Sequence, residues 1–294
     1  MTCRPEPFDF AQGRLREGPP SALLVFLTAL FAASPVLAQD ELKELDTPYV
    51  PTPQVVVDKM LDLAQVKSGD MLIDLGSGDG RLVITAARQR GAHGFGVEID
   101  PQLVKLSNAN AQRAGVADRA RFLQEDLFTT DFSEANVLTL YLLPDVNLKL
   151  RPRILAELSP GTRVVSHDYG MGDWKPDAQE TVAAPEKSVG LRKESTAYLW
   201  IVPAKVEGDW ELHIAGRLIP LRLAQRYQFV SGTVEGAPIS GGRLRGNELR
   251  MTLPGRVLGG EPVELVGRVG GDVMSGGAPR AERENAVWSA RRSR

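Results

Sequence analysis

The chain has 294 residues, of which 43% are hydrophobic, and its formal net charge is −2. This length suffices for one large and one small packed domain, and a charge so near zero gives no electrostatic case for a nucleic-acid partner. Cys3 is the single cysteine, which excludes an intrachain disulfide and a cysteine zinc site. The three histidines are scattered at 93, 167 and 213, so we expect no metal centre.

Residues 1–38 have the pattern of a signal peptide or membrane anchor. Arg14 and Arg16 precede an apolar run over 22–33, and the small residues up to Ala38 suit cleavage there. The run is short for a transmembrane helix. We expect export to the periplasm or attachment to the inner membrane. There are three alternatives to this interpretation. The anchor stays uncleaved and the enzyme faces the cytoplasm, translation starts further downstream, or the apolar run is a buried N-terminal helix.

Residues 39–53 form a polar, proline-rich lead-in, because prolines hold backbone extended. A helix with Val56, Met60 and Leu61 on one face follows, and then a strand-like run over 71–75. This run opens a glycine loop, Asp-Leu-Gly-Ser-Gly-Asp-Gly over 74–80. Glycine lets the backbone approach a ligand closely, and a helix N-terminus beyond the loop presents free N–H groups. The stretch predicts a small-ligand site.

The glycine spacing separates the candidate ligands. A dinucleotide site would read G-x-G-x-x-G, but Arg81 stands where the third glycine or alanine belongs. An NAD site is therefore the weaker alternative. The loop also lacks the lysine of a phosphate-binding loop. Two further carboxylates end the next strand-like runs, Glu98 after 94–97 and Asp126 after 121–125. The first could accept both hydroxyls of a ribose, and the second the exocyclic amine of an adenine.

A glycine loop followed by a ribose acid and an adenine acid resembles the class I S-adenosylmethionine-dependent methyltransferases. The resemblance implies S-adenosylmethionine as cofactor, whose sulfonium and α-amino groups suit carboxylates, and Asp74 beside the loop would suit the amino group. The residues expected to bind it in this region are Asp74, Gly76, Ser77, Gly78, Glu98, Asp126 and Leu127. An ordinary strand–helix turn with acidic helix caps is the structural alternative.

Further apolar runs at 136–143, 162–167 and 197–202 alternate with a helix over about 145–158. Strands that alternate with helices indicate a doubly wound sheet. We expect an α/β fold with a mostly parallel, seven-stranded Rossmann-like methyltransferase sheet over 54–204. From 205 to 294 the helical periodicity is lost and glycines become dense. This part predicts a small antiparallel β domain, a meander, sandwich or partial barrel, with a scaffolding or substrate-docking role.

Several stretches of sequence indicate a more specific family within the methyltransferases. They are 49–53, the glycine loop through Arg81, 140–144 with Asn147, 166–168 and 171–174. Together they resemble the family of mitochondrial lysine methyltransferases that modify the ATP synthase c-subunit and the adenine nucleotide translocase, with its bacterial relatives. The similarity spans roughly 49–176 and leaves out the β-rich tail.

This family resemblance assigns two further groups of residues. Those expected to close over the cofactor are Tyr49, Pro51 and Thr52, and those expected at the methyl-transfer end are Tyr141, Asn147, His167 and Asp168. In the second group, the pair at 167–168 would orient a substrate amine. The structural alternatives are a proline linker at 49–53, a core tyrosine at 141 and a hydrogen-bonded turn at 167–168.

The implied function is protein-lysine N-methyltransferase, with direct in-line methyl transfer that depends mainly on alignment of the reactants. The lysine must first lose a proton, which partial desolvation favours by lowering its pKa. The expected partner is a protein substrate, with membrane proteins one class of acceptor; no nucleic acid and no metal are expected. A small-molecule or other protein methyltransferase on the same fold, and a non-catalytic envelope-binding protein, are the alternatives.

Overall fold

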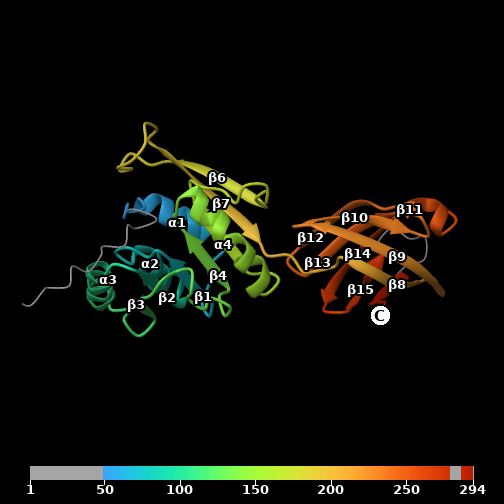
Figure 1. Cartoon of the computed structure of the whole chain (residues 1–294), viewed down its shortest axis with the longest axis horizontal. Coiled ribbons are helices and arrows are strands. Elements are labelled where there is room, and N and C mark those ends of the chain that lie inside the picture. Colours follow the sequence, from blue (N-terminus) through green and yellow to red (C-terminus); the bar gives the residue numbers. More distant parts are fainter. Residues whose placement is uncertain (1–48, 279–285, 294) are drawn as a thin grey trace, which may run out of the picture. The chain divides into compact units, whose positions relative to one another are not determined.

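The computed structural model describes residues 49–278 and 286–293. The predicted leader at 1–38, Cys3 and all but the last five residues of the lead-in lie outside the described residues. The described residues form two β-sheets with separate hydrophobic cores (Figure 1). Within these ranges, no helix has the length and apolar character needed to cross a membrane.

The first sheet has seven strands in the order β3-β2-β1-β4-β5-β7-β6. Their bounds are β1 Met71–Leu75, β2 His93–Glu98, β3 Ala120–Gln124, β4 Val137–Leu140, β5 Arg163–His167, β6 Ala178–Ala183 and β7 Glu194–Ile201. Strands β1 to β5 pair in parallel, whereas β7 runs antiparallel to both β5 and β6. This confirms the expected mostly parallel, seven-stranded methyltransferase sheet.

Helices cover both faces of this sheet. They are α1 Gln54–Leu63, α2 Arg81–Arg90, α3 Pro101–Arg113 and α4 Pro144–Glu157. Because side chains alternate along a strand, Leu72 of β1 packs in the cluster that contains α1 and α2, and Ile73 packs in the cluster that contains α4. Asp100 caps α3 by accepting from the Gln102 N–H at 2.7 Å, with Pro101 at the first helical position.

The second sheet corrects the prediction of a small meander, sandwich or partial barrel. Its elements are β8 Gly208–Ile214, β9 Arg217–Arg226, β10 Phe229–Val234, β11 Ala237–Pro238, β12 Ser240–Arg245, β13 Glu248–Leu253, η1 Gly255–Val257, β14 Val263–Gly270, β15 Val273–Ala278 and β16 Ala286–Arg292. Strand β10 pairs with β9 as well as with β12, so eight strands close into an antiparallel barrel, and the two-residue β11 pairs with β10.

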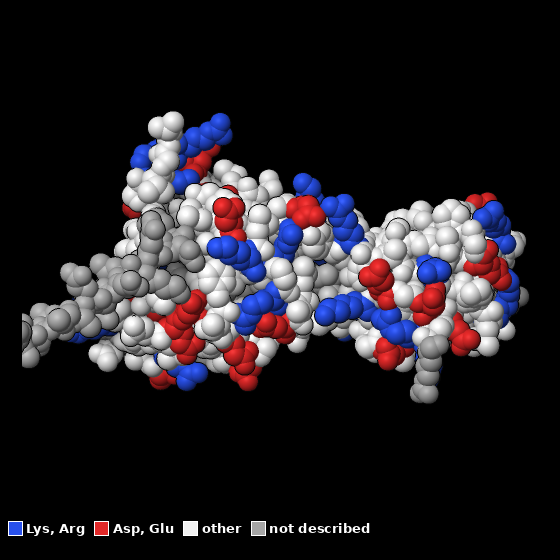
Figure 2. Space-filling view, in the orientation of Figure 1, with Lys and Arg blue, Asp and Glu red and all other residues white. Residues whose placement is uncertain are grey.

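The barrel interior is filled by its own side chains, among them Trp210, Met274 and Trp288, all buried. The pairing of β8 with β16 is essential to closure and joins residues far apart in sequence, such as His213 and Ser289. Alternation along a strand predicts its two faces but not its distant partner. On the face drawn in Figure 2, lysine and arginine side chains are interspersed with acidic ones, in keeping with the net charge of −2.

Candidate active site

The predicted site residues of the first sheet gather at the carboxyl ends of its parallel strands. Asp74 lies near the end of β1, Glu98 ends β2, Tyr141 follows β4 and His167 ends β5. Ligands of open α/β sheets bind at this edge. The structure therefore brings these four positions to one edge of the sheet, as the strand pattern predicts.

The glycine loop turns back toward β2. The N–H groups of Gly76 and Ser77 donate to the Val97 carbonyl at 3.0 and 2.9 Å. Gly76 and Gly78 have φ of +77° and +53°, a region that side chains disfavour. A Cβ on Gly78 would lie 2.5 Å from the Tyr49 ring, so the ring packs directly on the loop backbone. The Ser77 hydroxyl is buried and has no hydrogen-bond partner in the described structure.

Asp74 is a buried carboxylate, 4% exposed, whose Oδ1 accepts a hydrogen bond from the Thr139 hydroxyl at 2.7 Å. Burial raises the pKa of Asp74 to about 7; the Thr139 hydrogen bond opposes this shift, and the negative charges of Glu98 and Asp79 add to it. A cationic ligand group would relieve this repulsion. These carboxylates thus fit S-adenosylmethionine, which brings a sulfonium and an amino group and no phosphate.

The carboxylate of Glu98 is held in place by backbone donors. Its Oε2 accepts from the Gly78 N–H at 3.0 Å, and its Oε1 accepts from the N–H groups of Ile99 and Asp100 at 2.8 and 3.2 Å. Each carboxylate oxygen can accept about two hydrogen bonds, so capacity remains for a ligand hydroxyl. Its role as ribose acceptor stays a prediction.

Asp126 and Leu127 lie two and three residues beyond the end of β3, and both are partly buried. The Asp126 Oδ1 accepts from the Phe128 N–H at 2.9 Å, and its carbonyl accepts from the N–H groups of Thr129 and Thr130. The carboxylate thus stabilises the turn that follows β3. Contact with an adenine by either residue stays a prediction.

His167 lies fully buried at the end of β5, with its ring centroid 3.8 Å from that of Tyr141. Its Nδ1 is 3.3 Å from the Thr52 hydroxyl, and its Nε2 is 2.9 Å from the Ser195 hydroxyl. Burial lowers the pKa of His167 to about 4, although nearby Asp168 acts in the opposite direction. The ring is therefore neutral at physiological pH. Burial also raises the pKa of Tyr141 to about 12, with Asp168 as second cause.

Asp168 already has partners within the chain. Its Oδ2 lies 2.7 Å from the Lys187 ammonium, and its Oδ1 accepts from the Thr196 N–H at 2.9 Å. A substrate amine that approached this carboxylate would have to compete with Lys187. The predicted orienting role of 167–168 is not tested by this geometry.

Asn147 of α4 is also buried, next to the end of β5. Its Nδ2 donates to the Ser166 hydroxyl at 3.4 Å and to the Tyr169 carbonyl at 3.3 Å. Its Oδ1 has no hydrogen-bond partner in the described structure. Sequence reasoning missed other members of this polar cluster, Lys187 and Ser195. No motif marks them, because they come from the turn and strand after β6.

We expect the free energy of unfolding to depend on pH through His167. In the unfolded chain His167 binds a proton below pH 6.5, whereas the native ring binds it only below about pH 4. The free energy of unfolding therefore decreases as the pH falls from 6.5 to 4. Relative to His167→Asn, which cannot titrate, the parent should lose about 3 kcal/mol between pH 7 and pH 4. Urea unfolding at each pH measures this difference, and a difference that stays constant with pH would contradict the assignment.

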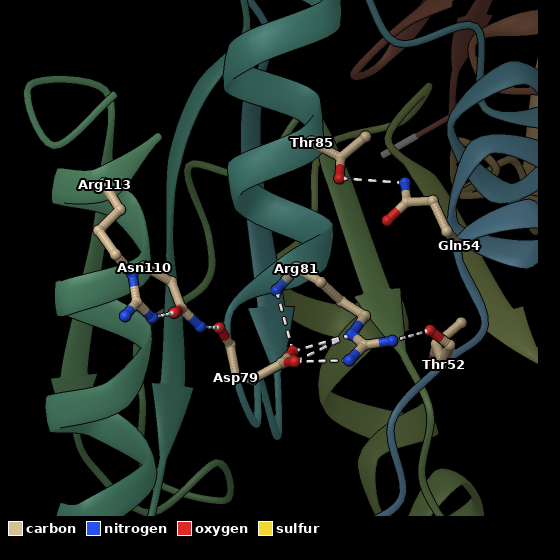
Figure 3. A network of polar contacts seen from close by, with 7 residues as sticks. All are labelled: Thr52, Gln54, Asp79, Arg81, Thr85, Asn110 and Arg113. Atoms are coloured by element: carbon tan, nitrogen blue, oxygen red, sulfur yellow. Dashed lines mark hydrogen bonds and ion pairs between the residues drawn. The ribbon is translucent and has the colours of Figure 1, made fainter. Parts of the chain in front are cut away.

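The lead-in residues 49–53 run from the glycine loop to His167, and we call this segment the strap. Pro51 is partly buried, and Thr52 is buried. The Arg81 Nη1 donates to the Thr52 carbonyl at 2.6 Å, and the Arg81 guanidinium also pairs with Asp79 (Figure 3). Sequence reasoning used Arg81 to reject a dinucleotide loop and as part of the family resemblance, but it assigned no contact to Arg81 or Asp79.

Comparisons with known proteins identify relatives of this chain. The family model for the ANTKMT methyltransferase domain matches residues 74–178. A protein-lysine N-methyltransferase of Saccharolobus islandicus is 40% identical over 156 residues, which cover 53% of this chain and 93% of that protein. The ATP synthase c-subunit lysine N-methyltransferase of Xenopus laevis is 33% identical over 151 residues, 51% of this chain and 66% of that protein.

A crystal structure of an RNA methyltransferase from Salinibacter ruber with S-adenosyl-L-homocysteine is 55% identical, with a TM-score of 0.48, and covers 53% of this chain and 96% of that one. These matches extend over about half of the chain. On the 40% identity that spans nearly the whole Saccharolobus islandicus protein, this chain belongs to the family of S-adenosylmethionine-dependent protein-lysine N-methyltransferases that includes the lysine N-methyltransferases of the ATP synthase c-subunit and of the adenine nucleotide translocase.

Proposed function

We propose that this chain transfers a methyl group from S-adenosylmethionine to the side-chain amine of a lysine in a protein substrate. The observation that carries the proposal is the 40% identity to a protein-lysine N-methyltransferase over 93% of that enzyme's length. The edge of the sheet supports it, because Asp74 and Glu98 place carboxylates, which suit a cationic cofactor, where open α/β sheets bind ligands.

When bound, the cofactor would supply a methyl group on a sulfonium sulfur. As the new N–C bond forms, the S–C bond breaks and the sulfur leaves as a neutral thioether. The chain's own residues align and desolvate the reactants. Asp74 and Glu98 hold the cofactor end, and the neutral ring of His167 packs on Tyr141 at the acceptor end. A lysine that enters this partly buried region loses its proton more readily, because burial disfavours the ammonium. The protein needs no strong general base, since alignment contributes most of the acceleration.

The acceptor is proposed to be a lysine of a membrane protein. Relatives that share this domain are named as lysine N-methyltransferases of the ATP synthase c-subunit and of the adenine nucleotide translocase. The predicted signal or anchor at 1–38 would bring the chain to a membrane, at the periplasmic or inner-membrane location proposed for it. The barrel, which follows the matched region 74–178, is proposed to act as a scaffold or docking module.

The test is a methylation assay with the full chain, cofactor labelled in its methyl group, and separate membrane, soluble-protein and RNA fractions. We expect label in a protein band of the membrane fraction, recovered as methyllysine after acid hydrolysis. Label only in RNA or in small molecules would overturn lysine methylation, and an absence of label in all fractions would favour a non-catalytic binding protein. The Glu98→Ala variant is the matched negative control.

A further inference from the structure

Arg81 connects the glycine loop to the strap at the point where these two segments meet. Its Nε donates to both carboxylate oxygens of Asp79 at 2.9 and 3.1 Å, and its Nη2 donates to Oδ2 at 2.6 Å. The remaining Nη1 donates to the Thr52 carbonyl at 2.6 Å. Figure 3 shows the guanidinium lying between these two acceptors. One side chain therefore ties two segments that are 29 residues apart.

Both partners of Arg81 are themselves fixed. The Asp79 carbonyl accepts from the Asn110 Nδ2 of α3 at 2.8 Å (Figure 3), so the loop tip is attached to the neighbouring helix. Thr52 is 5% exposed, and its hydroxyl lies 3.3 Å from the His167 Nδ1. The strap is thus anchored at the glycine loop through Arg81 and at the end of β5 through His167. The first anchor follows β1 and the second ends β5, and β4 lies between these two strands in the sheet.

Tyr49 completes the contact between the strap and the loop. Its ring lies so close to Gly78 that any Cβ there would be 2.5 Å from it. Burial and the nearby Asp79 raise the pKa of Tyr49. Burial alone would raise the pKa of Asp79, but the hydrogen bonds and charge of Arg81 outweigh it and lower that pKa. The side chains of Arg81 and Asp79 are 33% and 18% exposed, so the pair is only partly screened by water.

We propose that Arg81 is a positioning residue, which holds the strap 49–53 across the glycine loop by bridging the Asp79 carboxylate and the Thr52 carbonyl. Arginine suits this role because its planar guanidinium offers five donors in a fixed arrangement, whereas lysine offers a single point charge. The inference rests on the proposed function only in that the glycine loop binds the cofactor, and it does not depend on the identity of the methyl acceptor.

The first measurement is binding of S-adenosylhomocysteine to the full chain by calorimetry. Arg81→Gln should raise its Kd about tenfold or more, because hydrogen bonds to charged groups are lost and the strap is released. Arg81→Lys should stay close to Arg81→Gln, since lysine cannot reach both acceptors. In steady-state assays the loss should appear as a raised KM for S-adenosylmethionine with nearly unchanged kcat.

The second measurement needs no cofactor. The protein has five tyrosines, so ¹⁹F NMR of fluorotyrosine-labelled chain is tractable, and Tyr49→Phe assigns the Tyr49 signal. In the parent this signal should report a ring packed on Gly78, and in Arg81→Gln it should move to the position of a solvated tyrosine. Thr52→Val removes the His167 contact but keeps the carbonyl, so it should shift the signal less.

The matched control is Arg90→Gln, which removes an ion pair of Arg90 with Asp62, 2.5 Å long, from the other end of the same helix. It should leave the Tyr49 signal and the Kd unchanged. The inference is overturned if Arg81→Gln leaves both unchanged, if Arg81→Lys restores full affinity, or if Arg90→Gln produces the same loss. A parent that binds S-adenosylhomocysteine but methylates no lysine refutes the proposed function and leaves this inference standing.

Discussion

Glu98→Ala is expected to weaken S-adenosylhomocysteine binding by about a hundredfold or more, because two charge-assisted hydrogen bonds to the ribose hydroxyls are lost. The same change frees the Gly78 and Ile99 N–H groups that now donate to this carboxylate, so the glycine loop loses one of its attachments to β2 and keeps those to the Val97 carbonyl. Calorimetry on the full chain measures the effect, and circular dichroism verifies the fold. Affinity within threefold of the parent would contradict the assignment.

A double-mutant cycle separates the direct contact from the effect on the loop. The second change is made in the ligand, with an analogue that lacks the ribose hydroxyls. If Glu98 contacts these hydroxyls, removal of both partners should cost less than the sum of the two single losses, and hardly more than Glu98→Ala alone. Additive losses would mean that Glu98 acts only through the loop. Glu98→Gln, which keeps one acceptor oxygen, should fall between the parent and Glu98→Ala.

Asp74→Asn is expected to stabilise the cofactor-free protein at pH 8 by up to about 4 kcal/mol. The native pKa of Asp74 is about 7, against 3.8 for an ordinary aspartate. Between these values the unfolded chain has released a proton that the native chain keeps, so stability falls as the pH rises from about 4 to 7. Asparagine does not titrate, and its carbonyl can still accept from Thr139. Urea unfolding should therefore show equal stabilities near pH 4 and divergence by pH 8.

The same substitution should weaken cofactor binding, because asparagine carries no charge to attract the amino group. In the parent, S-adenosylhomocysteine affinity should rise between pH 6 and pH 8 as Asp74 ionises, and binding near pH 7 should release a proton. Calorimetry in buffers of different ionisation enthalpy counts that proton. Asp74→Asn should remove both the release and the pH dependence. A parent whose affinity is flat with pH would refute this role for Asp74.

The parallel sheet was predictable because its signals are local. Apolar runs, the glycine loop and the Asp100-Pro101 cap each lie within a few residues of the element that they define. Strand β6 was not predicted, because Ala178–Ala183 is a partly exposed edge strand without an apolar run. Barrel closure was also missed, since it depends on the pairing of β8 with β16.

The same distinction applies to the site. Asp74 and Glu98 could be placed from sequence, because parallel strands end at a common edge. Arg81 and Lys187 could not, because their significance comes from contacts with Thr52 and Asp168 in distant segments. The neutral state of His167 likewise depends on burial, which a sequence motif does not encode.

The closed ring of eight strands limits how another protein can bind the second sheet. In the described part of the chain, each of these strands has a hydrogen-bonded neighbour on both sides, so none of the eight is a free edge strand. A visiting segment therefore cannot be recruited as an additional strand. Recognition there must use the outward-facing side chains, so single substitutions on the barrel exterior can change binding preference while the barrel backbone stays the same.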